Sequence, residues 1–141
     1  MMACKTMGSP SACVIAGVLL GLSFASSSWA GQAPPDALVK MRAAFAAAAK
    51  AKDGASLAEM TVFPLVNEVY AEPKSISKAA FRGHVAEYSG LAQCLASAPL
   101  SADEETAHSS KLWLIFCDGI AFYFGLRDGQ WRHVKFANVN E

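Results

Sequence analysis

The sequence has no excess of either charge, because 12 lysines and arginines balance 12 aspartates and glutamates. It has no run of basic residues and no basic amphipathic segment, the patterns that bind nucleic acid or a membrane surface. Its hydrophobic runs are also short, and none reaches the roughly 20 residues of a membrane-spanning helix. The sequence therefore predicts no nucleic-acid partner and no membrane-embedded domain.

The motifs of common catalytic and cofactor sites are missing as well. The sequence contains no Gly-x-Ser-x-Gly, no glycine-rich loop with the spacing that cradles phosphates, and no His-Glu-x-x-His. Cys-x-x-Cys and His-x-x-x-His spacings are also absent, although His84, His108 or His133 could still join cysteines around a metal ion. We therefore predict no cofactor and no metal site.

The N-terminus has the pattern of a secretory signal peptide. Lys5 precedes an apolar run, CVIAGVLLGLSF, over residues 13–24, and Ser28-Trp29-Ala30 places small residues at the positions that a signal peptidase reads. We expect residues 1–30 to be removed after Ala30, which leaves residues 31–141 as a single exported domain in the periplasm or outside the cell. The alternative is an uncleaved anchor, which the polar Ser26–Ser28 segment disfavours.

Two cysteines remain in the expected mature chain, Cys94 and Cys117. An even pair in an oxidising compartment is expected to form a disulfide. Two buried free thiols and a cysteine–histidine metal site are the alternatives.

Hydrophobic spacing predicts helices in the first half of the mature chain. Residues 37–52 form an amphipathic pattern with Asp36 as a candidate N-cap, and residues 56–60 form a single helical turn. A strand is expected over residues 61–71, with Pro64 at its start or at a sheet edge. A second helix is expected over residues 76–88, with Ser77 as its N-cap.

Short strand-like runs fill the second half. Strands are expected over residues 91–97, 111–117, 120–126 and 131–139, with hairpin turns at Asp118-Gly119 and Asp128-Gly129. Helices followed by a meander predict an α+β fold, with helices covering one face of the sheet.

Three stretches resemble the NTF2-like (cystatin-like, SnoaL-like) superfamily: KDGASLAEMTVFPLV, SISKAAF and the closing DGIAFYF…DGQWRHVKFANVN. The resemblance implies a cone, in which a strongly curved antiparallel sheet wraps around two or three N-terminal helices and encloses an apolar cavity at its mouth. It also implies homodimers through the outer face of the sheet. It implies no particular activity, because this fold carries many functions.

Strand alternation supplies candidate site residues. Trp131, His133 and Lys135 are expected on one face of the last strand, and a cavity-facing Tyr123 and His133 would form an acid/base or binding pair with Glu68. The alternatives are His133 on the solvent face beside Lys135, and Tyr123 as a core aromatic. The full set of candidate cavity residues is Glu68, Tyr88, Trp113, Tyr123, Trp131 and His133.

We expect the exported domain to bind a small apolar ligand or a protein partner without catalysis, because polar groups that could act together are sparse. One alternative is an isomerase- or dehydratase-like proton-transfer enzyme in the cavity. Another is an inhibitor or immunity-like partner of an envelope protein.

Overall fold

The computed structural model describes residues 33–68, 74–103 and 112–138. The predicted signal peptide lies outside these residues. No helix within these three ranges is long and apolar enough to cross a membrane. The elements are α1 Asp36–Lys50, α2 Gly54–Glu59, β1 Thr61–Glu68, β2 Lys74–Ile76, α3 Lys78–Phe81, the 3₁₀ turn η2 Arg82–His84, α4 Val85–Gly90, α5 Ala92–Ser97, β3 Ser101–Ala102, β4 Trp113–Cys117, β5 Ile120–Arg127 and β6 Gln130–Asn138.

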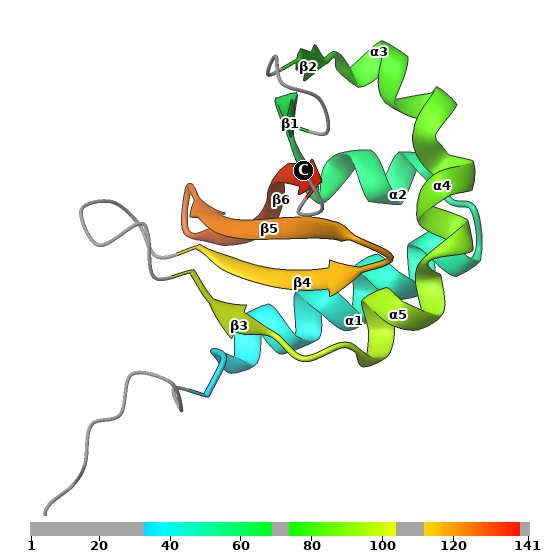
Figure 1. Cartoon of the computed structure of the whole chain (residues 1–141). Coiled ribbons are helices and arrows are strands. Elements are labelled where there is room, and N and C mark those ends of the chain that lie inside the picture. The colour runs from blue at the N-terminus through cyan, green and yellow to red at the C-terminus, as the bar shows by residue number, and fades with distance from the viewer. Residues whose placement is uncertain (1–32, 69–73, 104–111, 139–141) are drawn as a thin grey trace, which may run out of the picture. The chain divides into compact units, whose positions relative to one another are not determined.

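The strands form one open, curved sheet in the order β2-β1-β6-β5-β4-β3. The helices pack against one side of it, with α1 running behind β4 in Figure 1. We call this side the interior face and the opposite side the outer face. The predicted α+β class is confirmed. The expectation of a wholly antiparallel sheet is corrected, because β1 and β6 pair in parallel.

Pro64 lies inside β1, where we had expected a strand start or an edge. The pairing of β1 with β6 is interrupted between Thr61 and Val66, and Pro64 falls in that gap. Proline has no N–H to donate to a ladder, so the interruption accommodates it.

The predicted helices are present, with two corrections. Ser77 caps α3 by accepting a hydrogen bond from the backbone N–H of Ala80, as predicted. Asp36 is not an N-cap, because α1 begins at Asp36 itself, directly after Pro35. Residues 91–97 are not a strand: most of them form α5, which buries Ala92 and Leu95. Such a short apolar run cannot be assigned from periodicity alone.

Both predicted hairpin turns are confirmed. Asp118 and Gly119 have φ values of 51° and 76°, and Asp128 and Gly129 have values of 52° and 76°. Two consecutive positive φ values are the geometry of a tight turn whose twist matches the flanking strands.

The predicted disulfide is also present. Cys94 of α5 and Cys117 of β4 are joined with a Cα–Cα distance of 5.8 Å. The bond ties the last helix to the interior face of the sheet, close to the turn between β4 and β5.

Aromatic and aliphatic side chains fill the space between the helices and the sheet. The largest fully buried residues come from both layers: Leu38, Phe45, Leu57, Leu65, Phe81, Leu95, Trp113, Ile115, Cys117, Phe124 and His133. His133 is the only side chain in this set that can take up or release a proton near neutral pH. It is therefore the first candidate for a functional residue.

Candidate functional site

A bulge in β6 places His133 on the interior face. Tyr123 of β5 pairs with Lys135, and the next residue, Phe124, pairs with His133, so β6 contains one extra residue at Val134. Alternation therefore shifts by one position, and His133 and Lys135 lie on opposite faces. Our prediction that they share a face is wrong, as is the reading of His133 as a solvent-facing residue, because none of its surface is exposed.

His133 is hydrogen-bonded on both sides of its ring. Its Nδ1 lies 3.1 Å from the carbonyl oxygen of Tyr123, and its Nε2 lies 2.9 Å from the hydroxyl of Tyr88. A carbonyl only accepts, so Nδ1 carries the proton and donates it. The neutral Nε2 then accepts the hydrogen bond of the Tyr88 hydroxyl.

Aromatic rings surround this pair. The His133 ring centre lies 5.4 Å from that of Phe45 and 5.6 Å from that of Phe124, and Phe122 and Phe136 are also in ring contact with it. Tyr88 is itself only 3% exposed. Among the described residues, this shell leaves no part of the imidazole exposed.

Burial determines the protonation state of both partners. Loss of hydration disfavours the imidazolium and lowers the pKa of His133 to about 4, although the hydrogen bond to Tyr123 opposes the shift. Loss of hydration also raises the pKa of Tyr88 well above its usual range. Both groups are therefore neutral near pH 7.

The remaining predicted polar residues lie on the outer face. Lys135 Nζ lies 3.2 Å from Glu68 Oε2 and 4.4 Å from the centre of the Tyr123 ring, so a lysine links the two candidates. The structure does not bring the side chains of Tyr123 and Glu68 to His133. Of the predicted candidates it brings together Tyr88 and His133 at the interior face.

The two candidate tryptophans belong to the interior face. Trp113 is 2% exposed in the middle of the core, and Trp131 is partly buried against the same cluster. They contribute to the packed interior together with Tyr88 and His133. Among the described residues, no group of three or more His, Cys, Asp or Glu side chains could hold a metal ion.

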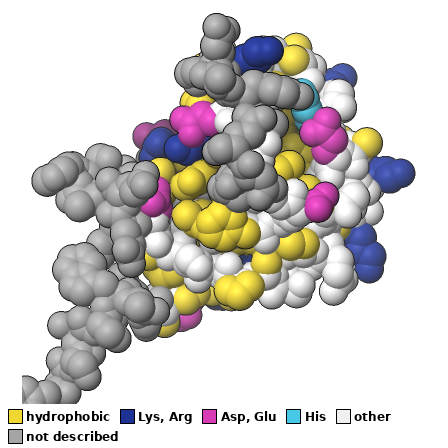
Figure 2. Space-filling view, viewed as in Figure 1, with side chains coloured by type: hydrophobic (Ala, Val, Ile, Leu, Met, Phe, Trp, Pro, Cys, Tyr) yellow, Lys and Arg dark blue, Asp and Glu magenta, His cyan; other side chains and the backbone are white. Residues whose placement is uncertain are grey.

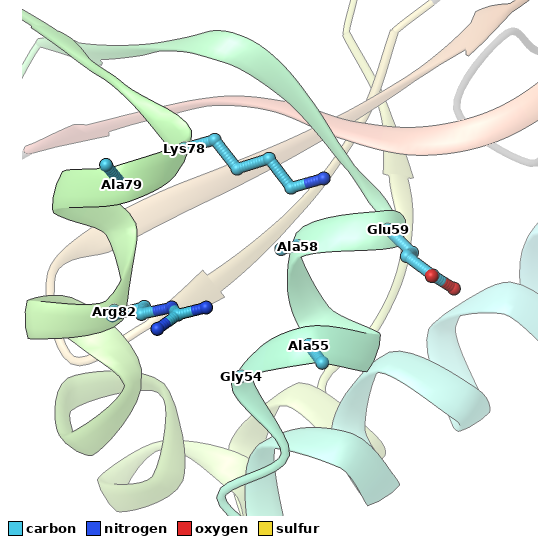
Figure 3. Close-up of a pocket in the computed structure, with 7 residues that line it drawn as sticks. All are labelled: Gly54, Ala55, Ala58, Glu59, Lys78, Ala79 and Arg82. Atoms are coloured by element: carbon cyan, nitrogen blue, oxygen red, sulfur yellow. The ribbon is translucent and has the colours of Figure 1, made fainter.

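A groove that the sequence analysis did not predict lies between α2 and α3. It has a volume of about 610 Å³ and is lined by Gly54, Ala55, Ala58, Glu59, Lys78, Ala79 and Arg82 (Figure 3). Lys78 and Arg82 are four residues apart, a spacing that places two side chains on the same side of a helix. That spacing is the sequence signal that could have indicated the groove.

The arrangement is similar to that of several solved structures. An NTF2-like protein with a cystatin-like fold from Novosphingobium aromaticivorans matches with 13% identity and a TM-score of 0.43, over 72% of this chain and 78% of that one. An NTF-2 like protein of unknown function from Shewanella oneidensis matches with 9% identity and a TM-score of 0.44, over 72% of this chain and 95% of that one.

A third, an NTF-2 like protein of unknown function from Silicibacter pomeroyi, matches with 18% identity and a TM-score of 0.41, over 72% of this chain and 90% of that one. All three descriptions name the family that the sequence motifs resemble. Likenesses at this level carry no inference about activity, ligand or partner. No family model and no curated protein matches the chain.

Proposed function

We propose that this protein is an exported, non-catalytic binding domain that uses the outer face of its sheet to bind another protein surface, and that a second copy of the chain is the partner. Export is supported by the leader-like residues 1–30 and by the Cys94–Cys117 disulfide, which suits an oxidising compartment.

The proposal that the domain is non-catalytic rests on the burial, protonation and hydrogen bonding of His133. Its ring is completely buried, is neutral near pH 7, and already uses both nitrogens in hydrogen bonds within the protein. A general base needs to reach the proton that it abstracts, either directly or through one water. This geometry argues against a proton-transfer enzyme at the interior face.

The same packing weakens the case for a small apolar ligand inside the cone. Phe45, Tyr88, Phe122 and Phe124 occupy the space around His133 with ring-centre distances below 6 Å. A ligand would need to displace these rings, which are well packed against one another. The outer face is therefore the better-supported binding surface.

The outer face combines apolar and small residues with a charged margin. Phe116, Ala121 and Ala137 are cross-strand neighbours on β4, β5 and β6, and the Lys135–Glu68 pair lies beside them. Both alanines are buried, so Phe116 is the accessible member of this row. Phe116 is 52% exposed, the largest exposure of any large hydrophobic residue described. Hydrophobic side chains gather over the middle strands on the side of the molecule seen in Figure 2.

An exposed phenylalanine on the outer face suits an isologous interface. In a dimer with twofold symmetry the same patch contacts itself, so the exposed Phe116 side chain can pack against its own copy. Burying an exposed aromatic side chain is one of the main sources of free energy at protein interfaces. Phe116 is therefore the residue whose replacement tests the proposal.

Sedimentation velocity of the exported protein tests it directly. We expect a concentration-dependent dimer for the wild type and a monomer for Phe116→Lys. Val39→Lys is the matched control, because Val39 is 39% exposed on α1, on the other side of the sheet. It should leave the dimer intact.

Two results would contradict the proposal. A wild type that stays monomeric at several hundred micromolar would rule out self-association, and a Phe116→Lys dimer of unchanged strength would place the interface elsewhere. The mass of the same sample tests export: we expect Gly31–Glu141 less two hydrogens, and an intact leader or free thiols would overturn that part.

A further inference from the structure

Two cationic side chains extend into the groove between α2 and α3. Lys78 begins α3, and Arg82 begins the 3₁₀ turn that follows it. Figure 3 shows both side chains reaching across the gap toward α2. Within the described ranges neither has a hydrogen-bond or ion-pair partner. The groove therefore contains two positive charges that no nearby acid of the described chain neutralises.

The opposite wall offers no compensating charge. Glu59 is the only acid among the described residues that line the groove, and its carboxylate is turned away from Lys78 and Arg82. The rest of that wall consists of Gly54, Ala55 and Ala58, which present a backbone and methyl groups. An anion entering the groove would meet the cations on one side and apolar carbon on the other.

At Gly54, one of the lining residues, two elements approach closely. A Cβ added to Gly54 would lie 3.1 Å from Val85 Cγ2, so the glycine allows the start of α2 to lie directly against α4.

A second, more polar hollow adjoins the groove. It shares Ala58, Glu59 and Lys78 with the first and adds Met60, Thr61, Phe63 and Gln130. It also contains Arg132, whose guanidinium is already occupied by the Glu59 carbonyl and the Gln130 side chain. The apolar surface therefore lies in the first hollow, on the Ala55–Ala58 wall that faces the free cations.

We propose that this groove binds a fatty-acid-like carboxylate, with the carboxylate between Lys78 and Arg82 and the alkyl chain along the Ala55–Ala58 wall. The charge of the groove calls for an anion, and its methyl-lined wall calls for an apolar body. Charge-assisted hydrogen bonds from an ammonium and a guanidinium are among the stronger contacts that a carboxylate makes. The site is separate from the outer face of the sheet and does not depend on the proposed dimer.

Octanoate is a suitable probe, because it is soluble without forming micelles at millimolar concentration. We would follow amide resonances of the exported, disulfide-bonded protein by NMR during titration. We expect saturable shifts confined to residues 54–60 and 78–85. The Lys78→Gln/Arg82→Gln double variant should bind octanoate at least tenfold more weakly.

Lys40→Gln/Lys50→Gln is the matched control, because it removes two exposed lysines of α1 outside the groove. It should change the affinity less than twofold. Two further ligands separate the contributions of charge and chain: 1-octanol lacks the carboxylate, and inorganic phosphate lacks the chain. Each should bind at least tenfold more weakly than octanoate.

The proposal is overturned if octanoate binds the Lys78→Gln/Arg82→Gln variant as tightly as it binds the wild type. It is also overturned if 1-octanol or phosphate equals octanoate, or if the shifts map to the core around His133. Circular dichroism of each variant confirms that the fold is retained, which we expect because Lys78 and Arg82 are both exposed.

Discussion

Acidification from pH 7 to pH 5 should reduce the free energy of unfolding by about 2 kcal/mol through His133 alone. The reason is the difference in pKa between the two states of the protein. In the unfolded chain the imidazole titrates near its ordinary pKa of 6.5, whereas in the folded protein burial lowers the pKa to about 4. Between these values the unfolded state binds the proton and the folded state does not.

The sign and the range follow from this difference. Above pH 6.5 the imidazole is neutral in both states and contributes no pH dependence. As the pH falls from 6.5 toward 4, protonation stabilises only the unfolded chain, so stability is lost throughout that interval. The complete interval corresponds to about 3 kcal/mol at roughly 1.4 kcal/mol per pKa unit. Most of the loss occurs by pH 5, above the range where exposed carboxyl groups titrate.

Urea unfolding at pH 7 and pH 5 measures the effect, with tryptophan fluorescence as the signal. In His133→Gln the titrating ring is absent, so we expect the difference between the two pH values to shrink by about 2 kcal/mol. His84→Gln is the matched control, because it removes a partly exposed imidazole and leaves His133 in place. Equal pH dependence in the wild type and His133→Gln would refute the reasoning. So would an NMR titration in which the ring of folded His133 gains its proton near pH 6.5.

Two further predictions concern the attachment of α5. Reduction of the Cys94–Cys117 disulfide, which spans 23 residues, should lower the free energy of unfolding by about 3 kcal/mol in the chain-entropy model. Urea unfolding with and without reductant measures this loss, and an unchanged unfolding midpoint would contradict the prediction. Arg42→Met should cost about 1–2 kcal/mol, because the Arg42 guanidinium donates to the carbonyl oxygens of Ala98 at 2.6 Å and Leu95 at 3.4 Å at the end of α5. Chemical denaturation measures this loss of stability. An Arg42→Met variant as stable as the wild type would show that water satisfies the carbonyl oxygens of Leu95 and Ala98 equally well.

Local signals in the sequence predicted much of the fold. The Asp-Gly pairs at 118–119 and 128–129 fixed both hairpins, because few other residue pairs tolerate two positive φ values in succession. Ser77 fixed the start of α3, because its side chain satisfies a backbone N–H that the helix leaves free. Cys94 and Cys117 are the two cysteines outside the predicted leader, so their pairing followed from that prediction.

Sequence reasoning failed where pairing between distant elements decides the outcome. Residues 91–97 have a pattern that suits either a strand or a helix, and packing against α1 together with the disulfide to β4 selects the helix. The parallel pairing of β1 with β6 depends on how the intervening helices cross the sheet, which no local motif specifies.

In the candidate site, too, the sequence predicted some features and only the tertiary structure decided others. The sequence by itself determined the residue types, namely a histidine, tyrosines and tryptophans among strands of alternating character. Only the tertiary structure decided their faces, because a single extra residue at Val134 reverses the alternation of β6 and separates His133 from Lys135. It also decided the groove, since Lys78 and Arg82 face α2 only once α2 and α3 have packed together. A bulge and a helix contact arise from interactions between segments far apart in the chain, and alternation within one segment carries no record of them.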